Sequence, residues 1–197
     1  NAGADALLCV TPYYNKANES GLIEHFNFIA EHANLPMIVY NVPSRTGMSI
    51  APETYRKLSA NPLICAVKEA SGSIASIART RALCGDELDI YAGNDDYIVP
   101  VLSIGGKGVI SVLGNLLPDR VHEMCELCAN GKFASAAKLQ IELMPLIDAL
   151  FSDVNPIPVK EALALAGFDV GPLRLPLYPL SEERREALRG VLRRFTL

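Results

Sequence analysis

Lys68 stands at the end of an apolar segment in the run ICAVKEASG, residues 64–72, just before a turn of small residues. Burial of an ammonium group is costly unless the group is paired, neutral or used in chemistry. In a dry strand end the pKa of the amine falls, and a neutral amine can form a Schiff base with a carbonyl. The iminium would let the adjacent carbon lose a proton and attack an aldehyde. The alternative is a structural salt bridge from Lys68 to Glu69 or Asp95, and spacing alone leaves both readings open.

Other polar residues follow the neighbouring predicted strands. Tyr40 ends the preceding one, where a phenol could shuttle protons between bound intermediates, although aromatic packing at a wet edge is the alternative. Arg45, two residues after Pro43, could grip a substrate carboxylate through two hydrogen bonds, unless it is an ordinary exposed loop arginine. Gly93 in GNDD could let a backbone carbonyl approach a ligand closely, or could serve only a tight turn.

The sequence gives little support for a metal site. Cys125 and Cys128 have a CxxC spacing, but no second pair accompanies them, and they would share one helix face as packing residues. Asp95 and Asp96 have no predicted third ligand. The glycine cluster at 105–108 precedes a predicted strand, whereas a phosphate-binding loop precedes a helix. We therefore expect no metal.

Strand-like and helix-like segments alternate through the first part of the chain. The predicted strands are 4–10, 35–42, 63–70, 88–95 and 108–115, and the predicted helices between them are 19–34, 51–60, 73–85 and 96–106. This alternation, with strands rich in β-branched residues, predicts a parallel sheet covered on both faces. The segments 118–130, 133–151, 155–167 and 181–195 have helical patterns.

Five βα units are too few for an eight-stranded barrel, which typically has about 250 residues. The chain has 197 residues and opens with NAGADALL, which resembles a helix end entering a strand and has neither a methionine nor a signal-peptide pattern. The residues leave two architectures open. Either roughly three βα units precede this chain in a longer polypeptide, or it forms a smaller open α/β sheet.

Composition narrows the function classes. The net charge is -4 with a sequence pI near 5.4, which argues against a nucleic-acid partner. No apolar run reaches the roughly 18 residues of a membrane span, so we expect no membrane partner. The five cysteines are scattered along the chain, which fits a reducing compartment and predicts a cytoplasmic location.

Five motifs occur in order along the chain: VTPYYN, YNVPSRTG, VKEASG, YAGNDD and NPIPVK. Together they resemble the dihydrodipicolinate synthase family, within the pyruvate-dependent class I aldolases typified by N-acetylneuraminate lyase. The resemblance covers the chain from end to end and implies a (β/α)8 TIM barrel. Residues 1–130 would supply the fourth strand onward and residues 131–197 a C-terminal helical region. The family's glycine–threonine motif would then lie upstream of Asn1.

The resemblance implies a lyase that joins pyruvate, held as a Schiff base on Lys68, to L-aspartate-4-semialdehyde. The product would be 4-hydroxy-tetrahydrodipicolinate, in the diaminopimelate route to lysine. No organic cofactor or metal is implied, because the lysine iminium is the electron sink. The implied assembly is a homotetramer of tight dimers, with lysine as a feedback inhibitor.

The resemblance also implies roles for individual residues. Tyr40 would be the relay tyrosine, and Tyr14 would be lent across the dimer interface to the neighbouring subunit's site. Arg45 would receive the carboxylate of the semialdehyde. Gly93 and Ile110 would line the pyruvate pocket with their backbones.

Tyr13 would lie at the dimer interface beside the lysine site.

Two other functions stay open. One is an aldolase acting on N-acetylneuraminate or 2-keto-3-deoxygluconate, against which Arg45 in VPSRTG is the discriminating residue. The other is a non-catalytic structural homologue.

Overall fold

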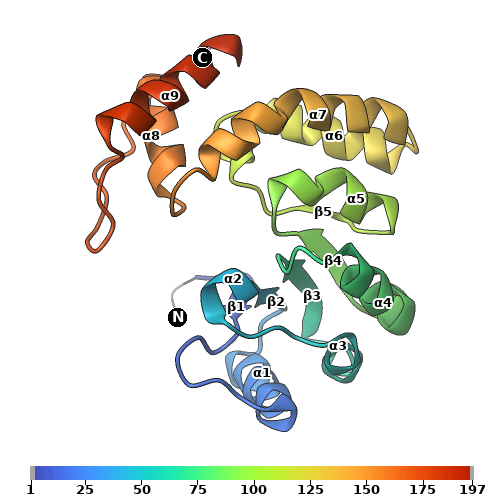
Figure 1. Ribbon diagram of the computed structural model, residues 1–197. Helices are drawn as coiled ribbons and strands as arrows, with labels where there is room; N and C mark the ends of the chain where they lie inside the picture. Colours follow the sequence, from blue (N-terminus) through green and yellow to red (C-terminus); the bar gives the residue numbers. More distant parts are fainter. Residues whose placement is uncertain (1–2, 196–197) are drawn as a thin grey trace. The chain divides into compact units, whose positions relative to one another are not determined.

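The chain divides into two compact units, Asn1–Ile110 and Ser111–Leu197, in the computed structural model, which describes residues 3–195. The first unit carries the sheet, and the second is helical (Figure 1). The boundary predicted after residue 130 lies within the second unit. It stays a prediction, because compactness does not decide which helices belong to a closed barrel.

The first unit contains a five-stranded parallel sheet whose strands follow one another in chain order. The strands are β1 Leu7–Val10, β2 Met37–Asn41, β3 Ile64–Glu69, β4 Asp89–Ala92 and β5 Gly108–Val109. This order confirms the parallel sheet predicted from the alternation of strands and helices. The predicted strand 108–115 is wrong after residue 109, because residues 113–115 form the 3-10 turn η3, and the Gly114 amide bonds to Ser111 Oγ at 2.7 Å.

The helices of the first unit connect successive strands. They are α1 Glu19–Ala33, α2 Pro43–Thr46, α3 Pro52–Leu58, α4 Ile74–Cys84 and α5 Ile98–Ser103, with 3-10 turns η1 Gly85–Glu87 and η2 Asp95–Tyr97. Polar caps fix their ends: Asn18 accepts from the Gly21 amide at the start of α1, and Asn34 ends it with a left-handed φ of 50°. The short helix α2 was not predicted from the sequence.

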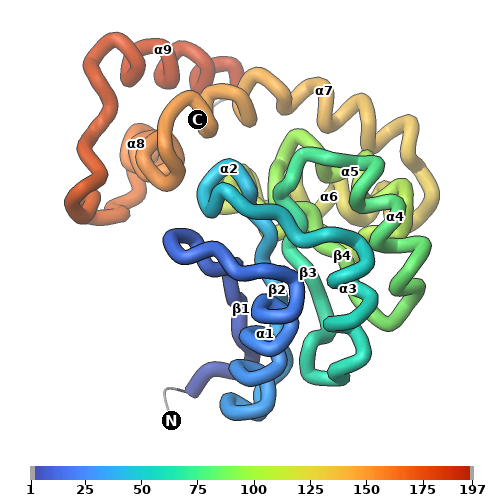
Figure 2. Tube along the Cα trace, turned by 60° about the horizontal axis from the view of Figure 1, so that its bottom comes forward, coloured from blue at the N-terminus to red at the C-terminus, as the bar shows by residue number. Residues whose placement is uncertain are grey.

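A hydrophobic core fills the space between the sheet and helices α1, α3 and α4, which lie on the same side of the strands (Figure 2). We call this the outer face of the sheet. Its fully buried side chains include Phe26, Met37, Leu58, Ile64, Val67, Ile77 and Ile90. The alternate residues Leu8 and Val10 of β1 are exposed. They belong to the opposite face, called the inner face here.

The described residues of the second unit, 111–195, form η3, four α-helices and the turn η4. The elements are η3 Leu113–Asn115, α6 Pro118–Ala129, α7 Phe133–Leu150, α8 Ile157–Leu165, α9 Glu182–Leu192 and η4 Arg193–Phe195. All four helices lie at the predicted segments. Their buried residues recur at helical spacing, as in Leu139, Leu143 and Leu146 of α7. Within residues 3–195, no helix is both long and apolar enough to cross a membrane.

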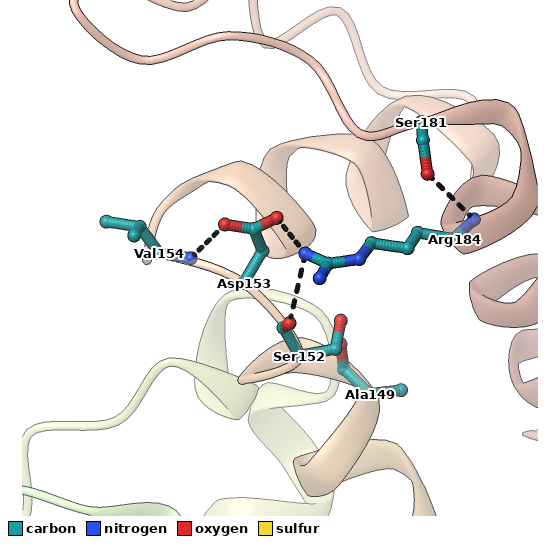
Figure 3. A network of polar contacts seen from close by, with 6 residues as sticks. All are labelled: Ala149, Ser152, Asp153, Val154, Ser181 and Arg184. Carbon is teal, nitrogen blue, oxygen red and sulfur yellow. Dashed lines mark hydrogen bonds and ion pairs between the residues drawn. The ribbon is translucent and has the colours of Figure 1, made fainter.

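A polar contact network holds the start of α9 against the segment that follows α7 (Figure 3). The Arg184 guanidinium pairs with Asp153 and donates to the Ser152 carbonyl at 3.5 Å. Ser181 accepts from the Arg184 amide at 3.4 Å and so caps the start of α9. The Arg184 side chain is half exposed, so the ion pair contributes about 1 kcal/mol or less.

The outer-face core predicts a strong contrast between two phenylalanines of α1. Phe26 is 0% exposed and Phe28 is 60% exposed. Phe26→Ala should lower the free energy of unfolding by about 3–5 kcal/mol, because it leaves a cavity against the sheet. Phe28→Ala, the matched control, should cost about 1 kcal/mol or less. Urea denaturation measures both, and equal losses would contradict this description of the core.

Candidate active site

Register places Tyr40, Lys68 and Tyr91 in one row across the inner face of the sheet. Tyr40 pairs with Lys68, and Lys68 pairs with Tyr91 on the next strand. Register partners in a parallel sheet project from the same face, and successive residues alternate between faces. Val39 and Val67 therefore enter the outer-face core, while Tyr40 and Lys68 project from the other side.

The structure brings two of the predicted catalytic side chains, Lys68 and Tyr40, into contact. Lys68 Nζ lies over the Tyr40 ring, 4.4 Å from its centroid. This distance is within the roughly 6 Å range of cation–π contact, so the amine and the phenol side chain lie next to each other. Both side chains are half-buried.

Burial dominates the electrostatics of this pair. It lowers the pKa of Lys68 below its ordinary value, with Asp95 acting in the raising direction and Arg45 in the lowering direction. Burial raises the pKa of Tyr40, and the Arg45 charge opposes this. The phenol is therefore protonated at neutral pH, whereas a larger fraction of the amine is neutral than for an ordinary lysine.

Arg45 is exposed in α2, on the loop that follows β2. Its positive charge influences the pKa of both Lys68 and Tyr40. The guanidinium is therefore near the pair and also open to solvent. A carboxylate arriving from solvent could be held there by two hydrogen bonds.

Glu69, one of the two salt-bridge partners considered for Lys68, lies on the outer face. Its carboxylate accepts hydrogen bonds from Asn41, Tyr55 and the Ser71 amide. Asp95 is buried, and its charge favours the protonated form of Lys68. The carboxylate that acts on the Lys68 amine is thus that of Asp95 and not that of its sequence neighbour.

Gly93 and Ile110 place backbone at the ends of two further strands. The Gly93 amide donates to the Glu69 carbonyl at 2.8 Å, and the Ile110 amide donates to the Ala92 carbonyl at 2.9 Å. A Cβ at position 93 would lie 2.7 Å from Ala70 Cβ and 3.0 Å from the Glu69 carbonyl oxygen. Glycine is therefore needed for the close approach of these strand ends. Pocket lining by both residues stays a prediction.

Tyr13 and Tyr14 do not pack into the site of their own chain. They lie in the loop after β1 and are 72% and 93% exposed. Such exposure is compatible with contributing side chains to another subunit. Their interface roles stay predictions.

Tyr55 is the polar residue of this region that sequence reasoning missed. It lies in α3, is fully buried, and donates to Glu69 Oε2 at 2.9 Å. Burial and the Glu69 charge raise its pKa well above the ordinary value. The only sequence signal was that Asn41 and Glu69, both polar, directly follow Tyr40 and Lys68 at the ends of two apolar strands.

No group of three or more His, Cys, Asp or Glu in residues 3–195 is arranged to hold a metal ion. Cys125 and Cys128 lie on α6, and burial raises the pKa of both thiols. They are therefore protonated packing residues at neutral pH, as their helical spacing predicted.

The parallel sheet, its outer helices and the strand-end lysine define this chain as part of a (β/α)8 barrel. The Dihydrodipicolinate synthetase family model matches residues 1–194, and the chain belongs to that family. The predicted family and the predicted partial barrel are both confirmed.

Three comparisons illustrate the similarity. A 4-hydroxy-tetrahydrodipicolinate synthase from Caldicellulosiruptor saccharolyticus is 57% identical over 190 residues, which cover 96% of this chain and 64% of that protein. A crystal structure of DHDPS from Cyanidioschyzon merolae with lysine bound has a TM-score of 0.93 at 40% identity, covering 96% of this chain and 65% of that one.

The third is a chloride-inhibited dihydrodipicolinate synthase from Acinetobacter baumannii complexed with pyruvate. It has a TM-score of 0.92 at 38% identity and covers 97% of this chain and 66% of that one. The chain thus spans somewhat less than two thirds of the length of these relatives.

The close approach at Gly93 predicts that Gly93→Ala lowers the free energy of unfolding by about 1–3 kcal/mol, because the added methyl group must displace a strand end. Gly190→Ala is the matched control. A Cβ there meets nothing within 4 Å in helix α9, so the change should be neutral or stabilising by up to about 1 kcal/mol. Chemical denaturation compares them, and a neutral Gly93→Ala would refute the close approach.

The charges around Lys68 predict two opposite pKa changes. Arg45→Gln removes a positive charge and should raise the pKa of Lys68, while Asp95→Asn removes a negative charge and should lower it. The rate of Lys68 acylation by a neutral reagent, followed by peptide mass across pH, measures the neutral amine. The midpoint should move to higher pH in the first variant and to lower pH in the second. Shifts in the same direction would contradict this electrostatic description.

Proposed function

We propose that the protein carrying this chain joins pyruvate to L-aspartate-4-semialdehyde, giving 4-hydroxy-tetrahydrodipicolinate in the diaminopimelate route to lysine. The observation that carries the proposal is the half-buried amine of Lys68, with its lowered pKa, 4.4 Å from the centre of the Tyr40 ring. Membership of the Dihydrodipicolinate synthetase family supports it, as does the similar structure complexed with pyruvate.

The chemistry begins with the neutral Lys68 amine attacking the keto carbon of pyruvate. The carbinolamine loses water to give an iminium, and the positive nitrogen lowers the barrier to removing a proton from the adjacent methyl group. The resulting enamine carbon attacks the aldehyde carbon, and a proton goes to the new alkoxide. The amino group of the condensed semialdehyde then attacks the iminium carbon, which closes the ring and expels the Lys68 amine. Loss of a proton from the ring nitrogen gives the cyclic imine, so one water is released overall.

Tyr40 moves protons in these steps. Its raised pKa keeps the phenol protonated at neutral pH, so it can donate to the departing hydroxyl of the carbinolamine. The phenolate then takes the proton from the methyl group beside the iminium, and the restored phenol donates to the alkoxide. Arg45 binds the carboxylate of the semialdehyde, for which its exposure and its nearness to Lys68 are the support. The backbones of Gly93 and Ile110 line the pyruvate pocket. The reaction uses no organic cofactor or metal, because the iminium is the electron sink.

The proposal includes a homotetramer of tight dimers in the cytoplasm. Tyr14 completes the site of a neighbouring subunit, and Tyr13 lies at the same interface beside a site for lysine. Support comes from the strong exposure of both tyrosines and from the similar structure with lysine bound. All five cysteines are free thiols, which suits a reducing compartment.

Borohydride trapping tests the proposal. Incubation of the protein carrying this chain with pyruvate and borohydride should add one reduced pyruvate to Lys68, as read by peptide mass. Lys68→Arg should abolish the adduct, because a guanidinium does not form it. Tyr40→Phe should trap at least roughly 100-fold more slowly, since it loses the proton relay.

Lys160→Arg is the matched control, because Lys160 lies in α8 and donates to the Pro172 carbonyl. It should trap at the wild-type rate. An adduct at another lysine, or none in the folded protein, would sink the proposed enzyme. Trapping at Lys68 with turnover of N-acetylneuraminate or 2-keto-3-deoxygluconate, but not of the semialdehyde, would assign a different aldolase.

A further inference from the structure

A buried carboxylate lies directly behind the proposed catalytic lysine. Glu69 is only 5% exposed, on the outer face between the sheet and α3. Its oxygens accept from Asn41 Nδ2 at 3.1 and 3.2 Å, from the Tyr55 hydroxyl at 2.9 Å and from the Ser71 amide at 2.8 Å. Both carboxylate oxygens are therefore satisfied by hydrogen-bond donors, as a buried polar group requires.

The donors come from three different elements. Asn41 ends β2, Tyr55 lies in α3, and Ser71 lies in the turn after β3. The carboxylate therefore fixes the neighbouring strand, a covering helix and the following turn relative to the end of β3. Each of these bonds involves the charged group, so each is stronger than a neutral hydrogen bond.

Asn41 extends the same network into the loop that carries Arg45. Its Oδ1 accepts from the Ile50 amide at 3.3 Å, and its Nδ2 donates to Ser49 Oγ at 3.4 Å. The loop between β2 and α3 is thus fastened at its far end to the residue from which it starts. The position of Arg45 in this loop depends on that closure.

The network lies one residue from each proposed catalytic side chain. Asn41 and Glu69 are register partners, as are Tyr40 and Lys68 immediately before them. Successive strand residues project from opposite faces. Asn41 and Glu69 therefore lie on the outer face directly behind Tyr40 and Lys68, which lie on the inner face. The hydrogen bond between Asn41 and Glu69 holds the ends of β2 and β3 at a fixed separation.

We propose that Glu69, held by Tyr55 and Asn41, is a positioning residue that keeps the Lys68 amine over the Tyr40 ring. The inference rests on the proposed function. Glu69 acts through the backbone of β3, because its carboxylate is on the other face from the substrate. The charges that shift the pKa of Lys68 are those of Asp95 and Arg45.

Tyr55→Phe is the sharpest test, because it removes one donor and keeps the buried ring. We expect the rate constant for borohydride trapping of pyruvate, per site finally trapped, to fall about tenfold, since small misplacements of reacting groups are costly. The final adduct stoichiometry should stay unchanged. A loss of folded protein would instead lower the stoichiometry and leave the rate constant per site as it was.

Thr54→Val is the matched control on the same helix. Thr54 is buried and donates to the carboxylate of Glu19 at 3.3 Å, away from the lysine. It should trap at the wild-type rate. Glu69→Gln is a second variant, which keeps the side-chain shape but loses the charge, and it should be slowed at least as much as Tyr55→Phe. Equal rates in wild type, Tyr55→Phe and Glu69→Gln would overturn the proposal.

A readout without pyruvate separates this proposal from the proposed function. Tyr40, Asp95, Arg45 and Tyr91 are the titratable groups that face Lys68 from the neighbouring elements. If Tyr55→Phe lets the amine move toward water, the midpoint of Lys68 acylation by a neutral reagent should shift to higher pH. Thr54→Val should leave that midpoint where it is.

The outcomes are distinguishable. A shifted midpoint without any adduct in the wild type supports positioning and overturns the proposed function. An adduct on Lys68 with the same trapping rate and the same midpoint in Tyr55→Phe and Glu69→Gln leaves the function standing and overturns positioning. If the wild type forms no adduct and the variants show no shift of the midpoint, both proposals are overturned.

Discussion

The removal of one lysine amine from water is the constraint on which the site depends. Desolvation is the largest influence on the pKa of Lys68, and the nearby charges of Arg45 and Asp95 act in opposite directions. For the proposed reaction, the surroundings must be dry enough to release a proton and still open enough to admit a keto acid. A parallel sheet end meets both demands, because apolar strands shield the base of the side chain and the loops after the strands leave its tip accessible.

Two adjacent residues of β3, Lys68 and Glu69, place their ionisable groups in opposite kinds of surroundings. Lys68 on the inner face meets an aromatic ring, and its charged form is disfavoured. Glu69 on the outer face meets three kinds of donor, which stabilise its charge. The alternation of a β-strand keeps these environments apart although the residues are neighbours in sequence. A reactive group and a rigid anchor thus share one short segment of backbone.

The sequence predicted the parts of this arrangement that depend on local pattern. Apolar runs located the five strands, helical spacing located most helices, and polar residues at the strand ends pointed to Lys68, Tyr40 and Arg45. The pattern did not reveal α2, whose single turn is too short to show a period. It extended the fifth strand too far, because the Ser111–Gly114 contact is a turn interaction without an apolar signature. Tyr55 was missed because its partner Glu69 is distant in sequence, and only the register of β2 and β3 with the packing of α3 brings them together.

The closed loop between β2 and α3 places Arg45, the proposed carboxylate-binding residue, apart from the strand ends that position Lys68. Its two ends are held by Asn41, whereas Arg45 lies between them on an exposed turn. The exposed residues Ser44 and Arg45 can therefore vary in side chain while the strand ends keep their spacing, whereas Thr46 between Arg45 and Gly47 is buried and bonded to the Val42 carbonyl. Under the proposed function, changes in this short stretch would alter which aldehyde is held and leave the amine untouched, which makes the loop a place for engineering a different carbon–carbon bond-forming catalyst.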